Sequence, residues 1–131
     1  MKWIQQYPVL VKSIPLVLAS WTLLTLYLTL MPADSLPDAK AFSYDKIGHF
    51  GMFGGWTGLL GMYFLYYRKN LEVNLVLITI LGILFGATME FLQLVLPINR
   101  VFSWYDILAN TIGAITAFYV LSYMRASIKI T

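Results

Sequence analysis

Four long apolar runs dominate this chain and restrict it to folds that suit a lipid bilayer. The runs cover about residues 14–31, 46–67, 72–96 and 104–124, and turn-rich or charged segments separate them. A helix needs about 20 apolar residues to cross the hydrocarbon core, and each run reaches or approaches that length. Within lipid, backbone groups must be bonded internally, which favours helices. The sequence therefore predicts an all-α, polytopic membrane protein, an antiparallel bundle of four transmembrane helices in a single domain over 1–131.

The composition supports this class and excludes several others. Only 11% of the residues are charged, whereas a soluble domain has about 25%. The chain has no cysteine, which excludes disulfides and thiolate sites, and its one histidine excludes a zinc site built on paired histidines. The basic residues flank apolar runs and form no continuous stripe, so we expect no nucleic-acid partner.

The distribution of basic residues predicts the orientation. A signal peptide has an apolar core of about 7–15 residues, and the first run is longer, so we expect an uncleaved helix. With four helices both termini share one side, and the more basic side should be cytoplasmic. That side holds Lys2, Lys12, Arg68, Lys69, Arg125 and Lys129, while Lys40, Lys46 and Arg100 lie opposite.

The second run is rich in glycine, with six of the chain's nine glycines. Each would cost about 1 kcal/mol against alanine in a soluble helix, but in a bilayer glycines allow close helix packing. No phosphate-binding pattern of the GxGxxG or GxxxxGK[ST] type is present. We expect this face to pack on a neighbouring helix or on another copy of the chain.

Polar side chains gather near the helix ends that face outward in this topology. At 1.5 Å per residue, Glu90 and Asn110 each lie about 9 Å inside their helix ends, and His49 lies about 6 Å inside its own. Since the second helix begins, the third ends and the fourth begins at one face, we expect these groups to form one layer. The layer contains Asp45, His49, Glu90, Gln93, Asp106 and Asn110, with Arg100 and Ser103 above it in the loop.

Short motifs in these segments resemble the signature of the VanZ-like family. Residues 45–53, Asp-Lys-Ile-Gly-His-Phe-Gly-Met-Phe, are similar to D-K-x-x-H-x-x-x-F, and residues 90–93 are similar to E-x-x-Q. The remaining matches are Pro97, Arg100, Ser103, Asp106, Asn110 and Gly113. The resemblance covers roughly residues 45–113 and leaves the first helix without a motif.

The resemblance implies a setting and not a reaction. The family takes its name from a glycopeptide (teicoplanin) resistance protein, and its members are small multi-helix membrane proteins. It therefore implies a multi-pass protein of the bacterial cytoplasmic (inner) membrane with a role in the cell envelope. Whether the protein is an enzyme stays open.

We predict that the polar layer binds or modifies a lipid-linked envelope molecule. His49 is the candidate proton carrier, Glu90 a candidate acid or base, and Arg100 a bidentate clamp for phosphate or carboxylate. The candidate catalytic residues are His49, Glu90, Arg100 and Asp106, and the candidate binding residues are Asp45, Gln93, Ser103 and Asn110. The expected partners are membrane lipids and a lipid-linked or phosphate-bearing ligand, with no cofactor.

Other interpretations stay open. The polar groups could form a structural network between helices, and the spacing favours Ser103 as a helix N-cap with Asp106 at N3 over a nucleophile. The inner half of every run is nearly all apolar, which argues against conduction by one copy but not against a binding or transport-accessory protein. A divalent cation would suit the carboxylates and His49, but Arg100 should repel it, so we expect no metal. The oligomeric state is not predicted.

Overall fold

The computed structural model describes residues 7–32, 35 and 45–129, and no strand occurs among them. This part contains four α-helices, α2 (Pro8–Leu30), α3 (Asp45–Met62), α4 (Leu75–Val95) and α5 (Trp104–Lys129), and a π-helical turn, η3 (Tyr63–Tyr67), which continues α3. The predicted all-α class is confirmed. Within the described part, three helices (α2, α4 and α5) are long and apolar enough to cross a membrane. The glycines and the charged start of α3 make that helix less apolar.

The helix ends differ from the ends of the apolar runs because helices continue into the polar flanks. α2 begins at Pro8, a first-turn position that proline tolerates, and continues through Pro15, whereas the apolar run began at residue 14. α5 continues beyond residue 124 to Lys129. α4 begins after residue 74 and not at 72, because the Asn74 side chain caps it by accepting a hydrogen bond of 3.1 Å from the Leu77 N–H.

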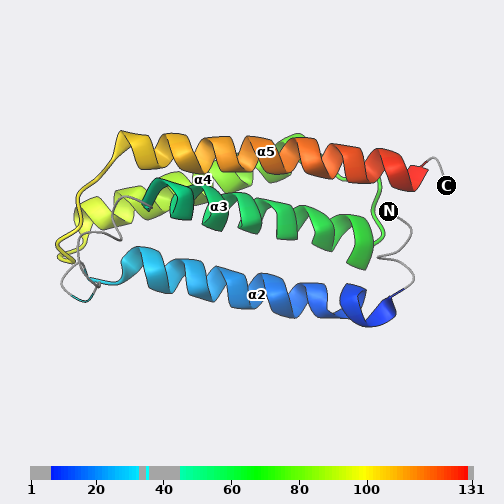
Figure 1. The fold of residues 1–131 in the computed structure, drawn as a ribbon, viewed down its shortest axis with the longest axis horizontal. Helices are drawn as coiled ribbons and strands as arrows, with labels where there is room; N and C mark the ends of the chain where they lie inside the picture. Colours follow the sequence, from blue (N-terminus) through cyan, green and yellow to red (C-terminus); the bar gives the residue numbers. More distant parts are fainter. Residues whose placement is uncertain (1–6, 33–34, 36–44, 130–131) are drawn as a thin grey trace.

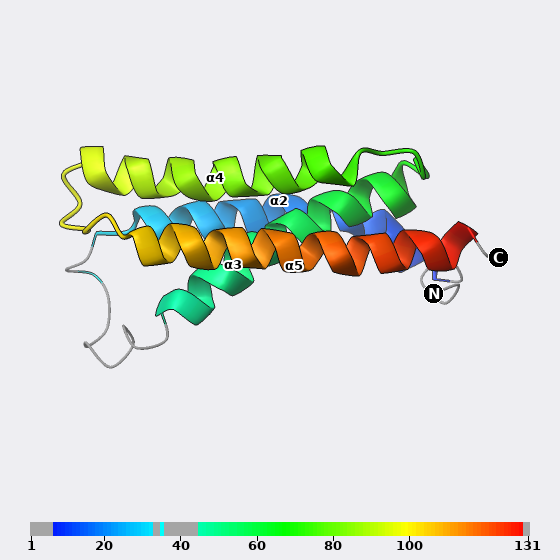
Figure 2. The same cartoon turned by 90° about the horizontal axis from the view of Figure 1, so that it is seen from above.

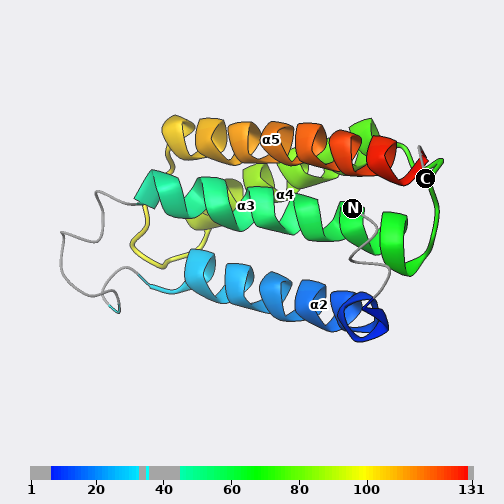
Figure 3. The same ribbon diagram turned by 45° about the vertical axis from the view of Figure 1, so that its right-hand side comes forward.

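Successive helices run in opposite directions along the molecule. In Figure 1 the first residues of α2 and α4 lie at the same end as the last residues of α5. α3 lies between α2 and α5 (Figures 1 and 3), and α4 runs along one side (Figure 2). The most extensive contact joins α3 and α5. This arrangement brings the start of α3, the end of α4 and the start of α5 to one end of the molecule.

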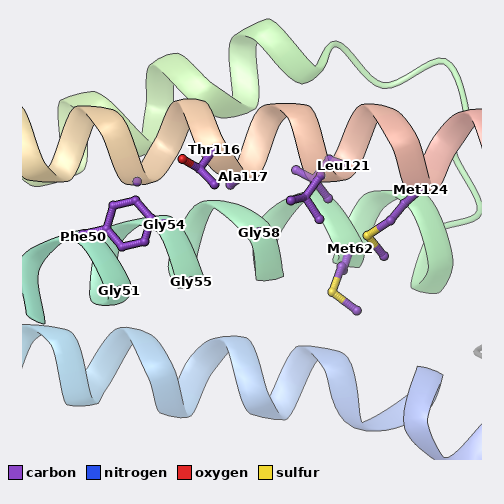
Figure 4. Close-up of a pocket in the computed structure, with 12 residues that line it drawn as sticks. Phe50, Gly51, Gly54, Gly55, Gly58, Met62, Thr116, Ala117, Leu121 and Met124 are labelled. Atoms are coloured by element: carbon purple, nitrogen blue, oxygen red, sulfur yellow. The ribbon is translucent and has the colours of Figure 1, made fainter. Parts of the chain in front are cut away.

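Glycines set the distance between α3 and α5. A Cβ atom added at Gly54 would lie 2.9 Å from the carbonyl oxygen of Gly113, and one added at Gly113 would overlap the carbonyl oxygen of Phe50. The two backbones therefore meet directly, as glycine-rich helices do in bilayers. Gly51 and Gly58 have nothing within 4 Å of an added Cβ, and they line an apolar groove of about 290 Å³ between the two helices (Figure 4).

The two ends of the molecule bury different kinds of side chain. Near the end of α5 the buried cluster is apolar and consists of Ile14, Leu65, Tyr66, Leu75, Leu121 and Met124. At the opposite end the buried side chains include His49, Glu90, Gln93, Asp106 and Asn110. Large apolar side chains cover much of the outer surface, a distribution that suits contact with lipid better than contact with water.

Candidate functional site

Three buried side chains from three helices meet at the end of the molecule where α3 begins. His49 comes from the second turn of α3, Glu90 from the last turns of α4, and Asp106 from the first turn of α5. One nitrogen or carboxylate oxygen from each lies within 4.8 Å of the others, and the three residues are 3%, 0% and 6% exposed. These three residues are called the polar cluster below.

His49 has a fixed place between α4 and α5. Its Nδ1 atom lies 3.1 Å from Asn110 Oδ1, a hydrogen-bonding distance, and 3.6 Å from Glu90 Oε1. Phe53, one turn further along α3, stacks beside the imidazole with ring centroids 6.0 Å apart. Asn110 fits because Gly86 has no side chain, since a Cβ there would lie 2.8 Å from Asn110 atoms. The imidazole and the carboxylate are thus slightly too far apart for a direct hydrogen bond, and proton transfer between them would need a small side-chain movement or one bridging water.

The loop before α5 joins Glu90 to the start of that helix. Ser103 is the N-cap of α5, because its Oγ accepts a hydrogen bond of 3.3 Å from the Asp106 N–H. The Ser103 N–H donates to Glu90 Oε2 over 3.3 Å. In a capping box the N3 side chain would accept this bond, and here Glu90 of α4 accepts it in place of Asp106. The N-cap expected from the sequence is observed, and the carboxylate of Asp106 lies with His49 and Glu90 in the polar cluster.

Lys46 belongs to the site but was absent from the predicted site residues. Its Nζ lies 3.6 Å from Asp106 Oδ1 and 5.8 Å from the centroid of the Tyr105 ring, while 58% of its side chain stays exposed. The ammonium group offsets part of the negative charge that Glu90 and Asp106 bring to the cluster. The signal was available in the sequence, because Lys46 is the second residue of the D-K-x-x-H motif.

Arg100 contacts a different partner from the one expected. It donates from Nε to the carbonyl oxygen of Met31 and from Nη2 to that of Leu28, each over 3.1 Å. Both carbonyls belong to the end of α2, where backbone oxygens lack helical partners and a positive charge is favourable. Arg100 therefore fastens α2 to the loop.

Gln93 also contacts α2, and Asp45 is only partly described. The buried Gln93 side chain donates from Nε2 to the carbonyl oxygen of Thr29 over 2.8 Å. Asp45 is the first residue of α3, but its side chain lies outside the described part of the structure. The structure thus brings together His49, Glu90, Asp106 and Asn110, with Ser103 beside them, while Gln93 and Arg100 bind the first helix.

A comparison with known protein families accounts for nearly the whole chain. The sequence pattern of the VanZ/LLP1 family matches residues 3–125. The chain belongs to the VanZ/LLP1 family. The resemblance found from the motifs in residues 45–113 is thereby confirmed, and the family match extends it to the first helix. No curated protein and no solved structure matches this VanZ/LLP1 chain.

The family match and the apolar helices both indicate a membrane protein. Three helices in the described residues have the length and composition of membrane spans. Together these observations identify a VanZ-like membrane protein. Within it, the motif residues His49, Glu90, Asp106 and Asn110 occupy one buried site.

Proposed function

We propose that this protein crosses the bacterial cytoplasmic membrane four times and that its polar cluster binds or modifies a lipid-linked cell-envelope molecule at the outer face. The observation that carries the proposal is the burial of His49, Glu90 and Asp106 together within an otherwise apolar bundle. Ionisable side chains buried within a membrane bundle are costly and rare. Where they occur, they usually serve a ligand or proton pathway.

The length of α3 supports a fourth span. The helical segment from Asp45 to Tyr67 is continuous through η3 and measures about 33 Å, enough for a hydrocarbon core of about 30 Å. Arg68 and Lys69 follow its end, and Arg125 lies near this turn, since it donates from Nη1 to the carbonyl oxygen of Val73 over 3.1 Å. By the positive-inside rule this basic end is cytoplasmic and the polar cluster is near the outer surface.

Single cysteines introduced into this naturally cysteine-free chain test the orientation. We expect Ser35→Cys to react with a membrane-impermeant maleimide added to intact cells. We expect Asn70→Cys, in the exposed turn between η3 and α4, to react only after the membrane is opened. The reverse pattern would contradict the proposed orientation, and labelling of both positions from outside would contradict α3 as a membrane span.

The chemistry of the cluster suits an anionic headgroup with an exchangeable proton. His49 and Glu90 face each other over 3.6 Å and would carry the proton, while Asp106 and Asn110 would position the headgroup. One basic side chain, Lys46, lies beside Asp106 at the edge of the site. Arg100 bonds to α2 with two of its five N–H groups, and the other three are left for a ligand. A phosphate could pair with the rest.

Glu90→Gln tests the proposal because it keeps the size of the side chain and removes the charge. We expect binding or turnover of a labelled polyprenyl phosphate by the purified protein to fall at least about tenfold, the usual effect of losing a charged hydrogen-bonding group. The matched control is Glu72→Gln at the opposite end, where the carboxylate is 85% exposed and pairs with Lys129. Circular dichroism and gel filtration verify folding.

The same variants separate this proposal from a purely structural network. The hydrogen bonds of His49 with Asn110 and of Glu90 with Ser103 favour that second candidate function. A Glu90→Gln protein that folds normally and handles the polyprenyl phosphate like the unaltered protein would exclude a role of Glu90 in ligand chemistry.

A further inference from the structure

The polar cluster has the donor set of a cation site. His49, Glu90 and Asp106 each offer one ligand atom within 4.8 Å of the others, and all three side chains are more than nine-tenths buried. Asn110 Oδ1 adds an oxygen 3.1 Å from the imidazole. We propose that these side chains bind one divalent transition-metal ion, such as Zn²⁺ or Mn²⁺.

The type and spacing of the donors argue for this class of ion. One imidazole nitrogen with carboxylate oxygens suits Zn²⁺ and Mn²⁺, whereas Mg²⁺ favours oxygen ligands and retains its waters. Zinc bonds of about 2.0–2.2 Å place tetrahedral ligand atoms about 3.4 Å apart. The donors would thus close by up to about 1.4 Å around the ion, a movement that side-chain rotation can supply.

An unpaired carboxylate oxygen at the same place provides a second and independent observation. Among the described residues, Asp106 Oδ1 is buried and has no hydrogen-bond partner. A buried polar atom without a partner costs about 1–3 kcal/mol. The ion pair of Asp106 Oδ1 with Lys46 spans 3.6 Å, longer than the roughly 2.7–2.9 Å of a charge-assisted hydrogen bond. A cation between the carboxylates would satisfy Asp106 directly.

The surroundings of the cluster orient its ligands and allow the nearby positive charge of Lys46 to move away. The Ser103 N–H fixes Glu90, as outer-shell partners do in metal sites. Lys46 is the cation now beside Asp106, and its half-exposed side chain can swing outward. We infer that Lys46 competes with the metal ion for this carboxylate.

The proposed metal site adds an ion to the polar cluster of the proposed function. It rests on the proposed function only in being placed at the same cluster. Two carboxylates repel a phosphate-bearing headgroup, and a bound dication would remove that conflict. The binding of the ion needs no headgroup, so it can be tested with the metal alone. Failure to bind polyprenyl phosphate would leave a positive metal result intact, and the reverse also holds.

Equilibrium dialysis of chelator-stripped protein in detergent, followed by elemental analysis, tests the proposal. With Zn²⁺ or Mn²⁺ alone we expect one ion per chain, with weaker binding of Mg²⁺. His49→Gln and Asp106→Asn should each weaken binding at least about tenfold, since even outer-shell changes cost about 10–100-fold. Glu72→Gln, which alters an exposed carboxylate far from the cluster, should bind like the unaltered protein.

Lys46→Gln gives a result that a merely structural network does not predict. Removing the competing ammonium should tighten metal binding by about threefold to tenfold, because a nearby positive charge opposes a dication. Lys46 is exposed, so this variant should fold even if the buried ones do not. Absence of stoichiometric binding of either metal to the folded unaltered protein overturns the proposal. So does equal affinity in folded His49→Gln and Asp106→Asn, or unchanged or weaker binding in Lys46→Gln.

Discussion

His49→Leu should destabilise the protein by about 3 kcal/mol or more, while adding Glu90→Leu to it should recover part of that loss. Glu90 is fully buried and its Oε1 lies 3.6 Å from the imidazole. Removing one partner of a buried polar pair leaves the other in an apolar environment, at a cost of about 3–5 kcal/mol, whereas replacing both partners by apolar groups is often neutral or stabilising. Thermal unfolding in detergent measures each variant.

The double-mutant cycle isolates the interaction between the two side chains. If the free-energy changes of the single variants simply add in the double variant, His49 and Glu90 are not coupled, and the compact cluster described here is wrong. Leu60→Ala is a suitable control for loss of apolar contact alone, since Leu60 is half-buried on the same helix. Its effect should be independent of the substitution at Glu90.

Gly113→Ala should lower the unfolding free energy by about 2–3 kcal/mol although alanine is the better helix former. An added Cβ would overlap the carbonyl oxygen of Phe50 and lie 3.1 Å from the backbone nitrogen of Gly54. These are backbone atoms that cannot rotate away, so α3 and α5 would have to separate. The displacement would reach the polar cluster, because Asn110 precedes Gly113 by one turn of α5.

Gly58→Ala is the matched control for this prediction. Gly58 belongs to α3 and lines the groove between α3 and α5, but an added Cβ there would have nothing within 4 Å. The higher helix propensity of alanine should leave the stability unchanged or raise it by up to about 1 kcal/mol. Equal melting temperatures for Gly113→Ala and Gly58→Ala would mean that the two helix backbones do not meet at Gly113.

The sequence carried enough information for the helices and for the buried part of the site. Apolar length predicts where α4 and α5 lie, and the constant rise of an α-helix places Glu90 and Asn110 at similar depths. The structure agrees, since both side chains lie close to His49 Nδ1. These positions are predictable because short side chains on packed helices can reach only nearby atoms.

The long basic side chains could not be assigned from the sequence. Arg100 and Lys46 can each reach in several directions, and the choice depends on which partner is nearer in space. Arg100 contacts backbone carbonyls of α2, which carry no sequence signal, and Lys46 contacts Asp106 across two helices. The sequence predicted a role for Arg100 and none for Lys46, and the partners of both residues needed coordinates.

The C-terminal end of the first helix is held through atoms that every amino acid possesses. Gln93 and Arg100 bond to the main-chain oxygens of Leu28, Thr29 and Met31, which the last turn of α2 leaves available. A replacement side chain at any of these three positions would present the same oxygen. This attachment therefore determines where the helix ends and leaves the side chains at the three positions free to vary, whereas further back in α2 the side chains of Trp21 and Thr22 themselves bond to α3.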